Sequence, residues 1–147
     1  PVTGIFYQTG DMTITRHKHA ATTLADGRVL IIGGSDARDG RGQYASAETY
    51  DPVSGTFTAV GDMNAERFKL PHAVVLLRTG EVLVAGGDVR VEVYDPTTNV
   101  FRLGEGSVGA DLSFSTATLL PNGHVLIVGG YDSRIQPASG AWVYRPR

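Results

Sequence analysis

Three apolar stretches of the chain each end in a pair of glycines. The pairs are Gly33–Gly34, Gly86–Gly87 and Gly129–Gly130, and a turn signal (Asp-Gly, Thr-Gly or Asn-Gly) precedes each apolar stretch at the same spacing. Repetition at a fixed spacing is typical of architectures in which each unit buries its apolar face against its neighbour. The sequence therefore predicts three stacked copies of one structural unit.

Each unit reads as a set of short β-strands. Nineteen glycines and seven prolines supply turns, and helical periodicity is nearly absent. The first and second units each contain four candidate strands and the third contains three; the expected ranges are 20–24, 29–33, 47–50 and 56–60, then 73–77, 82–86, 91–94 and 100–103, then 116–120, 125–129 and 141–144.

The amino-terminal segment supplies a further candidate strand. Residues 4–12 match residues 55–63 at both glycines and at the Phe, Asp and Met positions. We therefore expect residues 5–9 to be an orphaned fourth strand; the alternative is a coincidental aromatic strand at a terminus. A single domain, 1–147, then divides into the orphan strand (1–10) and units 11–61, 62–104 and 105–147, the last without its fourth strand.

The motifs resemble those of the Kelch-repeat β-propellers along essentially the whole chain. Besides the Gly-Gly pairs, the matching features are two Tyr-Asp-Pro turns, two later aromatics where that family often has tryptophan, and two leads in the bacterial style; these are Tyr50-Asp51-Pro52, Tyr94-Asp95-Pro96, Phe57, Phe101, Met12…Arg16…His19 and Met63…Arg67…His72. The third unit departs from the pattern, because it lacks the Met and Arg lead and has Val143-Tyr144-Arg145-Pro146 instead of Tyr-Asp-Pro.

The resemblance implies an all-β, Kelch-type β-propeller in which each unit is one four-stranded blade. Tyr50 and Tyr94 would then fill the space between blades, and the six paired glycines would end the second strands. Propellers close with about 4–8 blades, so three blades form a half-ring with exposed ends. Either the chain is a fragment of a larger propeller, or two copies form a six-bladed homodimer in which residues 5–9 of one chain complete the third blade of the other.

Composition excludes several classes of function. A formal net charge of -2 without a Lys/Arg-rich run argues against nucleic acid as a partner. The absence of cysteine excludes disulfides, thiolate metal sites and cysteine nucleophiles. No apolar run is long enough for a membrane-spanning helix, and no motif indicates a cofactor. Because the chain begins at Pro1, we expect processing or excision from something longer; the compartment is undetermined, with a secreted or periplasmic location favoured over a cytoplasmic one.

Candidate binding residues gather in the long loops that this fold would place on one face. They are Arg16, His17, His19, Asp36, Arg38, Arg41, Arg67, Phe68 and Tyr131. Arg16 and Arg67 occupy equivalent positions and could grip an anionic ligand; a repeated structural salt bridge to a neighbouring blade is the alternative. His17 and His19 could share a metal, but no third ligand is evident and we expect a structural hydrogen bond and no metal. Asp36 could bind calcium or cap its loop, and the polar loop 35–42 could serve recognition or simply be mobile.

The function that these features favour is a non-catalytic scaffold that binds a protein or glycan through its long-loop face. The alternative is a glycan-acting hydrolase or lyase, in which some of Asp36, Glu48, Glu66 and Asp111 would converge at the channel mouth. A fragment of a larger propeller without an independent function is the third reading.

Overall fold

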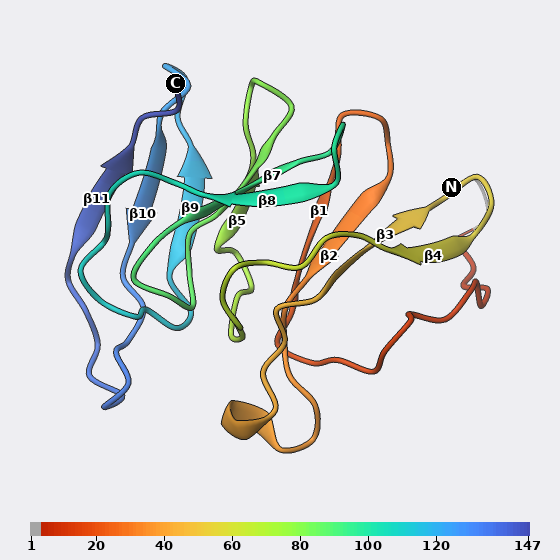
Figure 1. Ribbon diagram of the computed structural model, residues 1–147, viewed down its shortest axis with the longest axis horizontal. Helices are drawn as coiled ribbons and strands as arrows, with labels where there is room; N and C mark the ends of the chain where they lie inside the picture. Colours follow the sequence, from red (N-terminus) through yellow and green to blue (C-terminus); the bar gives the residue numbers. More distant parts are fainter. Residues whose placement is uncertain (1–3) are drawn as a thin grey trace.

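The computed structural model describes residues 4–147 and consists of β-sheets with one short 3-10 turn. The first sheet contains four antiparallel strands in the order β1-β2-β3-β4 (Figure 1). Their bounds are Ala20–Thr23, Val29–Ile32, Ala47–Asp51 and Thr56–Ala59, with the 3-10 turn η1 (Asp39–Arg41) between β2 and β3.

The second sheet repeats this order, and the third repeats its first three strands. The second contains β5 (Val74–Leu76), β6 (Val82–Val84), β7 (Glu92–Asp95) and β8 (Val100–Leu103). The third contains β9 (Thr116–Leu119), β10 (Val125–Val128) and β11 (Ala141–Tyr144). The all-β fold built from repeated blades is thus confirmed.

The three blades pack side by side around their first strands. Strand β1 contacts β5, and β5 contacts β9, so the innermost strands are neighbours and the sheets fan outward to form a half-ring (Figure 1). Each sheet is an antiparallel meander, in which strands that follow one another in the sequence are neighbours in the sheet.

The core consists of two apolar clusters, one on each side of the middle blade. Val82, Val84 and Tyr94 belong to the cluster shared with the first blade, whereas Leu83 and Val93 belong to the cluster shared with the third. This alternation is the period of two along a strand. Because both faces of the middle blade are covered, its strands β5 and β6 consist of Val and Leu alone.

The Gly-Gly pairs tie one blade to the next. Gly34 adopts a φ of +91°, and a Cβ there would lie 2.6 Å from the carbonyl oxygen of His17. The Gly34 N–H donates to the Arg67 carbonyl oxygen of the second blade (2.8 Å), as that of Gly87 donates to Leu112 before the third (3.1 Å). Glycine is needed here because no side chain fits so close to another backbone.

Residues 4–10 form no strand in the structure. Ile5, Phe6 and Tyr7 are exposed, and Phe6 is wholly so. The Gly10 N–H nevertheless donates to the Gly55 carbonyl oxygen (3.0 Å), just as the Gly61 N–H donates to Asn99 (3.1 Å). The segment therefore departs from the first blade at the place where β4 departs from the second, at the end of the half-ring away from β11 (Figure 1).

Candidate functional site: the long-loop face

The long connections of all three blades emerge on one side of the sheets. This long-loop face carries the segments before β1, β5 and β9 and the loops that follow β2, β6 and β10, including η1 (lower side of Figure 1). Isolated bridges such as His17 with Ser35 and Ser113 with Tyr131 hold the segments against the loops. The face is therefore a set of braced loops on a rigid scaffold, the arrangement from which binding sites are usually built.

Arg16 lies inside the first blade. Its guanidinium donates to the Gly33 and Ser46 carbonyl oxygens (2.7 and 3.0 Å) and forms a salt bridge with the buried carboxylate of Glu48 (3.0 Å). Burial lowers the pKa of Arg16 from its ordinary value, and the charge of Glu48 opposes this shift.

Arg67 repeats this arrangement in the second blade. It has no exposed surface, donates to the Gly86 and Arg90 carbonyl oxygens (2.8 and 2.7 Å) and pairs with buried Glu92 (3.0 Å). Each arginine thus pairs with a glutamate of its own blade, rather than of a neighbouring blade. The sequence placed both arginines at equivalent positions, but it did not reveal their carboxylate partners.

The third blade replaces both members of this pair. The Leu112 carbonyl oxygen accepts a hydrogen bond from the Gly87 N–H, as the Arg67 carbonyl oxygen does from the Gly34 N–H, so Leu112 takes the place of the arginine. Trp142 takes the place of the glutamate, because it lies opposite Ile127 as Glu48 lies opposite Ile31. Leu112 is buried and Trp142 is partly buried. Replacing an ion pair at both ends by apolar residues removes the cost of burying charge.

The two histidines do not share a metal-ligand set. His17 Nε2 lies 3.8 Å from Asp39 Oδ1, and the same oxygen accepts from Lys18 Nζ (2.7 Å). Burial, followed by the charge of Arg16, lowers the pKa of His19. Within residues 4–147, no group of three or more His, Cys, Asp or Glu side chains could hold a metal ion.

Asp36 and Arg38 pair within their own loop. The Asp36 carboxylate accepts from the backbone and side chain of Arg38 (both 2.8 Å), which lowers the pKa of Asp36. Arg38 and Arg41 are exposed at the tip of the loop. Nearby, an open cavity of about 320 Å³ has buried Ser35 in its wall, whose hydroxyl has no hydrogen-bond partner; the other lining residues are Thr15, Arg16, His17, Asp36 and Ala37.

Aromatic side chains from two blades meet around a lysine. Lys69 Nζ lies 4.6 Å from the ring centre of Phe68 and 5.1 Å from that of Tyr131, and the Tyr131 ring lies 5.8 Å from Phe114. We call Phe68, Lys69, Phe114 and Tyr131 the aromatic–lysine cluster. Lys69 has no ion-pair partner among the described residues.

Phe68 and Tyr131 are among the candidate binding residues named from the sequence, and Lys69 and Phe114 are not. Lys69 and Phe114 adopt left-handed backbone conformations (φ 56° and 55°), as does Lys18 in the first blade (φ 55°). Such conformations are costly for these residue types and concentrate at functional sites. Lys18, Lys69 and Phe114 hold equivalent positions before the first strand of the three blades. This equivalence is the signal in the sequence that could have identified Lys69 and Phe114.

Comparisons with known proteins agree with the fold. The family model described as Kelch motif matches residues 16–64. Kelch-like protein 36 of Mus musculus is 30% identical over 127 residues, which is 83% of this chain and 20% of that protein; its Rattus norvegicus counterpart is 29% identical over the same lengths. The chain thus spans about one fifth of the length of these curated relatives. The solved structure of YjhT superimposes with a TM-score of 0.74 at 10% identity, over 87% of this chain and 48% of that one.

Proposed function

The chain belongs to the Kelch-repeat family of β-propeller proteins, and from this we propose that it is a non-catalytic scaffold that binds a protein or glycan through its long-loop face. No helix in residues 4–147 has the length and apolar character needed to cross a membrane.

The observation that carries the proposal is the aromatic–lysine cluster. Its rings offer apolar surface, and Lys69 offers a cation that forms no salt bridge within residues 4–147. Aromatic residues lose little conformational entropy on binding and supply much of the energy of recognition surfaces. A ligand that covers the rings and places an acceptor near Lys69 Nζ therefore satisfies both features at once.

The carboxylates give less support to a catalytic role. Hydrolysis of glycosides usually requires two carboxyl groups that flank the scissile bond. Glu48 is buried in its salt bridge with Arg16, and Asp36 accepts hydrogen bonds from Arg38. Two of the four acidic candidates thus have partners within the chain, and we retain a binding role.

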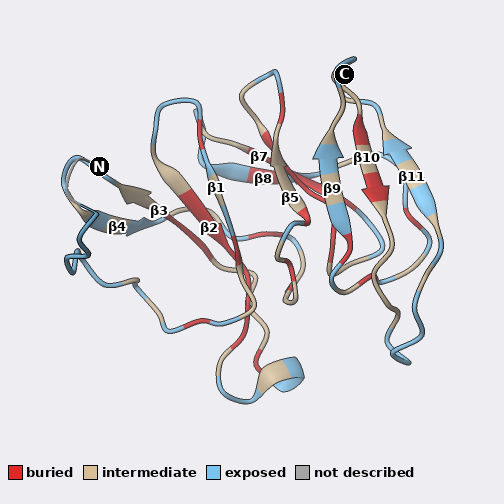
Figure 2. Ribbon diagram, turned by 180° about the vertical axis from the view of Figure 1, so that it is seen from behind, coloured by how far each residue is buried: buried red, intermediate tan, exposed pale blue. Residues whose placement is uncertain are grey.

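We also propose that two copies assemble into a six-bladed ring. The support is the shape of the half-ring, whose third sheet has an unpaired outer edge at β11 within the described residues and whose first sheet exposes β4 at the opposite end (Figure 2). A longer chain that continues the propeller would cover the same ends with its own blades.

The binding proposal is tested by screening the full chain against an immobilised glycan array and a phage library of random peptides. Binders from either screen are then measured against Lys69→Ala and Tyr131→Ala, with Arg134→Ala as the matched control, because Arg134 is an exposed cation on the same loop as Tyr131. We expect each cluster variant to weaken binding at least about tenfold, the usual effect of losing a central contact, and the control to leave it unchanged. Binders that ignore both cluster variants, or no binder at all, would contradict the proposal.

A further inference from the structure

We propose that residues 4–10 of a second copy of this chain dock on the outer edge of β11 as its fourth strand, with Phe6 packed on Tyr144. The inference rests on the proposed two-copy ring and names the contact that closes it. Three features of the chain support this contact: an unpaired strand edge, a segment that could pair with it, and the equivalent strand pairing in the two complete blades, which serves as the template.

The template is the contact between third and fourth strands in the two complete blades. Tyr50 pairs with Phe57 and Tyr94 pairs with Phe101, and in both cases the ring centres lie 4.8 Å apart with nearly the same tilt (43° and 44°). Such tilted aromatic pairs across strands stabilise a sheet beyond the area they bury.

The acceptor is β11. Tyr144 lies opposite Val125 in the register, as Tyr94 lies opposite Val82 and Tyr50 opposite Val29. In the described residues β11 pairs only with β10, and Val143 is 51% exposed. An open edge with exposed apolar side chains invites another strand.

The donor is the amino-terminal segment. Residues 4–10 carry the same Gly-x-Phe and terminal Gly positions as residues 55–61, which contain β4. Phe6, the equivalent of Phe57, contacts nothing that reduces its exposure. Gly10 is already anchored as Gly61 is, so the segment is directed away from its own first blade in the way that a fourth strand is.

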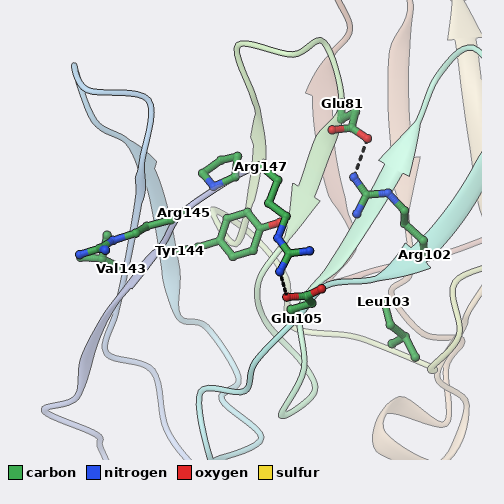
Figure 3. Close-up of a pocket in the computed structure, with 9 residues that line it drawn as sticks. Glu81, Arg102, Leu103, Glu105, Val143, Tyr144, Arg145 and Arg147 are labelled. Atoms are coloured by element: carbon green, nitrogen blue, oxygen red, sulfur yellow. Dashed lines mark hydrogen bonds and ion pairs between the residues drawn. The ribbon is translucent and has the colours of Figure 1, made fainter.

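A cavity of about 370 Å³ lies where the phenylalanine would enter (Figure 3). Tyr144 and Leu103 present apolar surface in its wall, so the cavity offers a phenyl ring contacts like those that Phe101 makes. Two ion pairs also line the cavity, Arg102 with Glu81 (2.7 Å) and Arg147 with Glu105 (2.5 Å).

The template fixes the register of the contact. Phe6 pairs with Tyr144, as Phe57 does with Tyr50, and Tyr7 therefore pairs with Val143, as Thr58 does with Thr49. Because donor and acceptor lie at opposite ends of the half-ring, two copies related by a two-fold axis each donate and each accept. The two equivalent contacts therefore form a closed dimer, not an open-ended chain of copies.

The first experiment measures the mass of the full chain by light scattering over a dilution series, with Phe6→Ala and Tyr7→Ala as matched variants. Both residues are exposed, so both variants keep the fold, and Tyr7 takes the place of Thr58 and Arg102, which stay exposed in complete blades. We expect a dimer whose dissociation constant rises at least about tenfold for Phe6→Ala, the effect of losing a buried aromatic anchor, and little for Tyr7→Ala. Trp142, the only tryptophan, lies on β11, and its emission should shift to longer wavelength as the dimer dissociates.

The second experiment tests the register with disulfides, which the cysteine-free chain makes unambiguous. Mixed Tyr7→Cys and Val143→Cys chains should cross-link on oxidation, because directly paired residues lie within the reach of a disulfide. The control pair, Tyr7→Cys with Ala141→Cys, is displaced by two residues and should not. A monomer at all concentrations overturns both the ring and the docked strand. A dimer whose dissociation constant is unchanged by Phe6→Ala, and in which both cysteine pairs cross-link equally, overturns the docked strand but not the ring. Neither result bears on the ligand screen.

Discussion

At the scale of the residue, two buried Arg–Glu pairs give the long-loop face its frame. Arg16 and Arg67 donate to the carbonyl oxygens of Gly33 and Gly86, so each guanidinium fastens its blade's Gly-Gly turn to the segment before the first strand. The repeats showed that the arginines are equivalent. They could not show the salt bridges, because each glutamate lies beyond a loop whose length differs between blades.

Removing Arg67 should destabilise the chain strongly. Arg67→Ala leaves the Glu92 carboxylate buried without its partner, and we expect a loss of about 3–5 kcal/mol in the free energy of unfolding, measured by urea denaturation at one protein concentration. Arg102→Ala breaks the exposed pair with Glu81 and should cost less than about 1 kcal/mol. Equal losses in the two variants would show that the buried pair is not a structural anchor.

His19 should make stability depend on pH. Burial and Arg16 lower its pKa in the folded chain below the ordinary 6.5, so the unfolded chain binds a proton first as the pH falls. Its contribution is therefore complete above about pH 6.5 and is lost as the pH falls through the lowered folded value. Wild type should lose more stability than His19→Gln between about pH 7.5 and pH 5. Parallel urea-midpoint curves for the two proteins would refute this role.

At the scale of the element, the sequence predicted the strands well because turn chemistry and the period of two are local properties. All eleven observed strands fall on predicted ones with small differences at their ends; β5 and β6, for example, are shorter than the ranges 73–77 and 82–86. The expected strand 5–9 pairs with no strand among residues 4–147, and pairing between strands is not a local property. The residues of this segment therefore favour a β-strand, but the structure does not pair them with another strand.

The two fourth strands should differ in what their phenylalanines contribute. Phe101 is buried between the first and second blades, whereas Phe57 is only half-buried on the first. For separated half-rings we expect Phe101→Ala to cost about 3–5 kcal/mol and Phe57→Ala about 1–2 kcal/mol, compared by urea denaturation in the Phe6→Ala background, in which the proposed ring does not form. A larger loss for Phe57→Ala would mean that another surface covers the first blade in solution.

At the scale of the whole molecule, the middle blade is covered on both faces and the outer two on one. Figure 2 shows buried residues on β2, in the middle sheet and on β10, and exposed residues on β4 and β11. The aromatic–lysine cluster also belongs to this scale, since Phe68 and Lys69 belong to the second blade and Phe114 and Tyr131 to the third. The sequence placed Phe68 and Tyr131 on one face, but their convergence on Lys69 depends on the rotation between blades, which no local pattern encodes.

If two half-rings close on each other, folding stability must depend on protein concentration. A dimer that unfolds to two chains gains apparent stability by mass action, about 1.4 kcal/mol per mole of dimer for each tenfold rise in concentration. We therefore expect the urea midpoint of the wild type to rise over a hundredfold concentration range (about two such steps), and that of Phe6→Ala to rise less, because its half-rings separate before they unfold. The slope of the transition should also fall for the separated chain, since less surface is exposed on unfolding. A wild-type midpoint that is the same at every concentration would mean that each half-ring is stable alone and that the outer edge of β11 faces water.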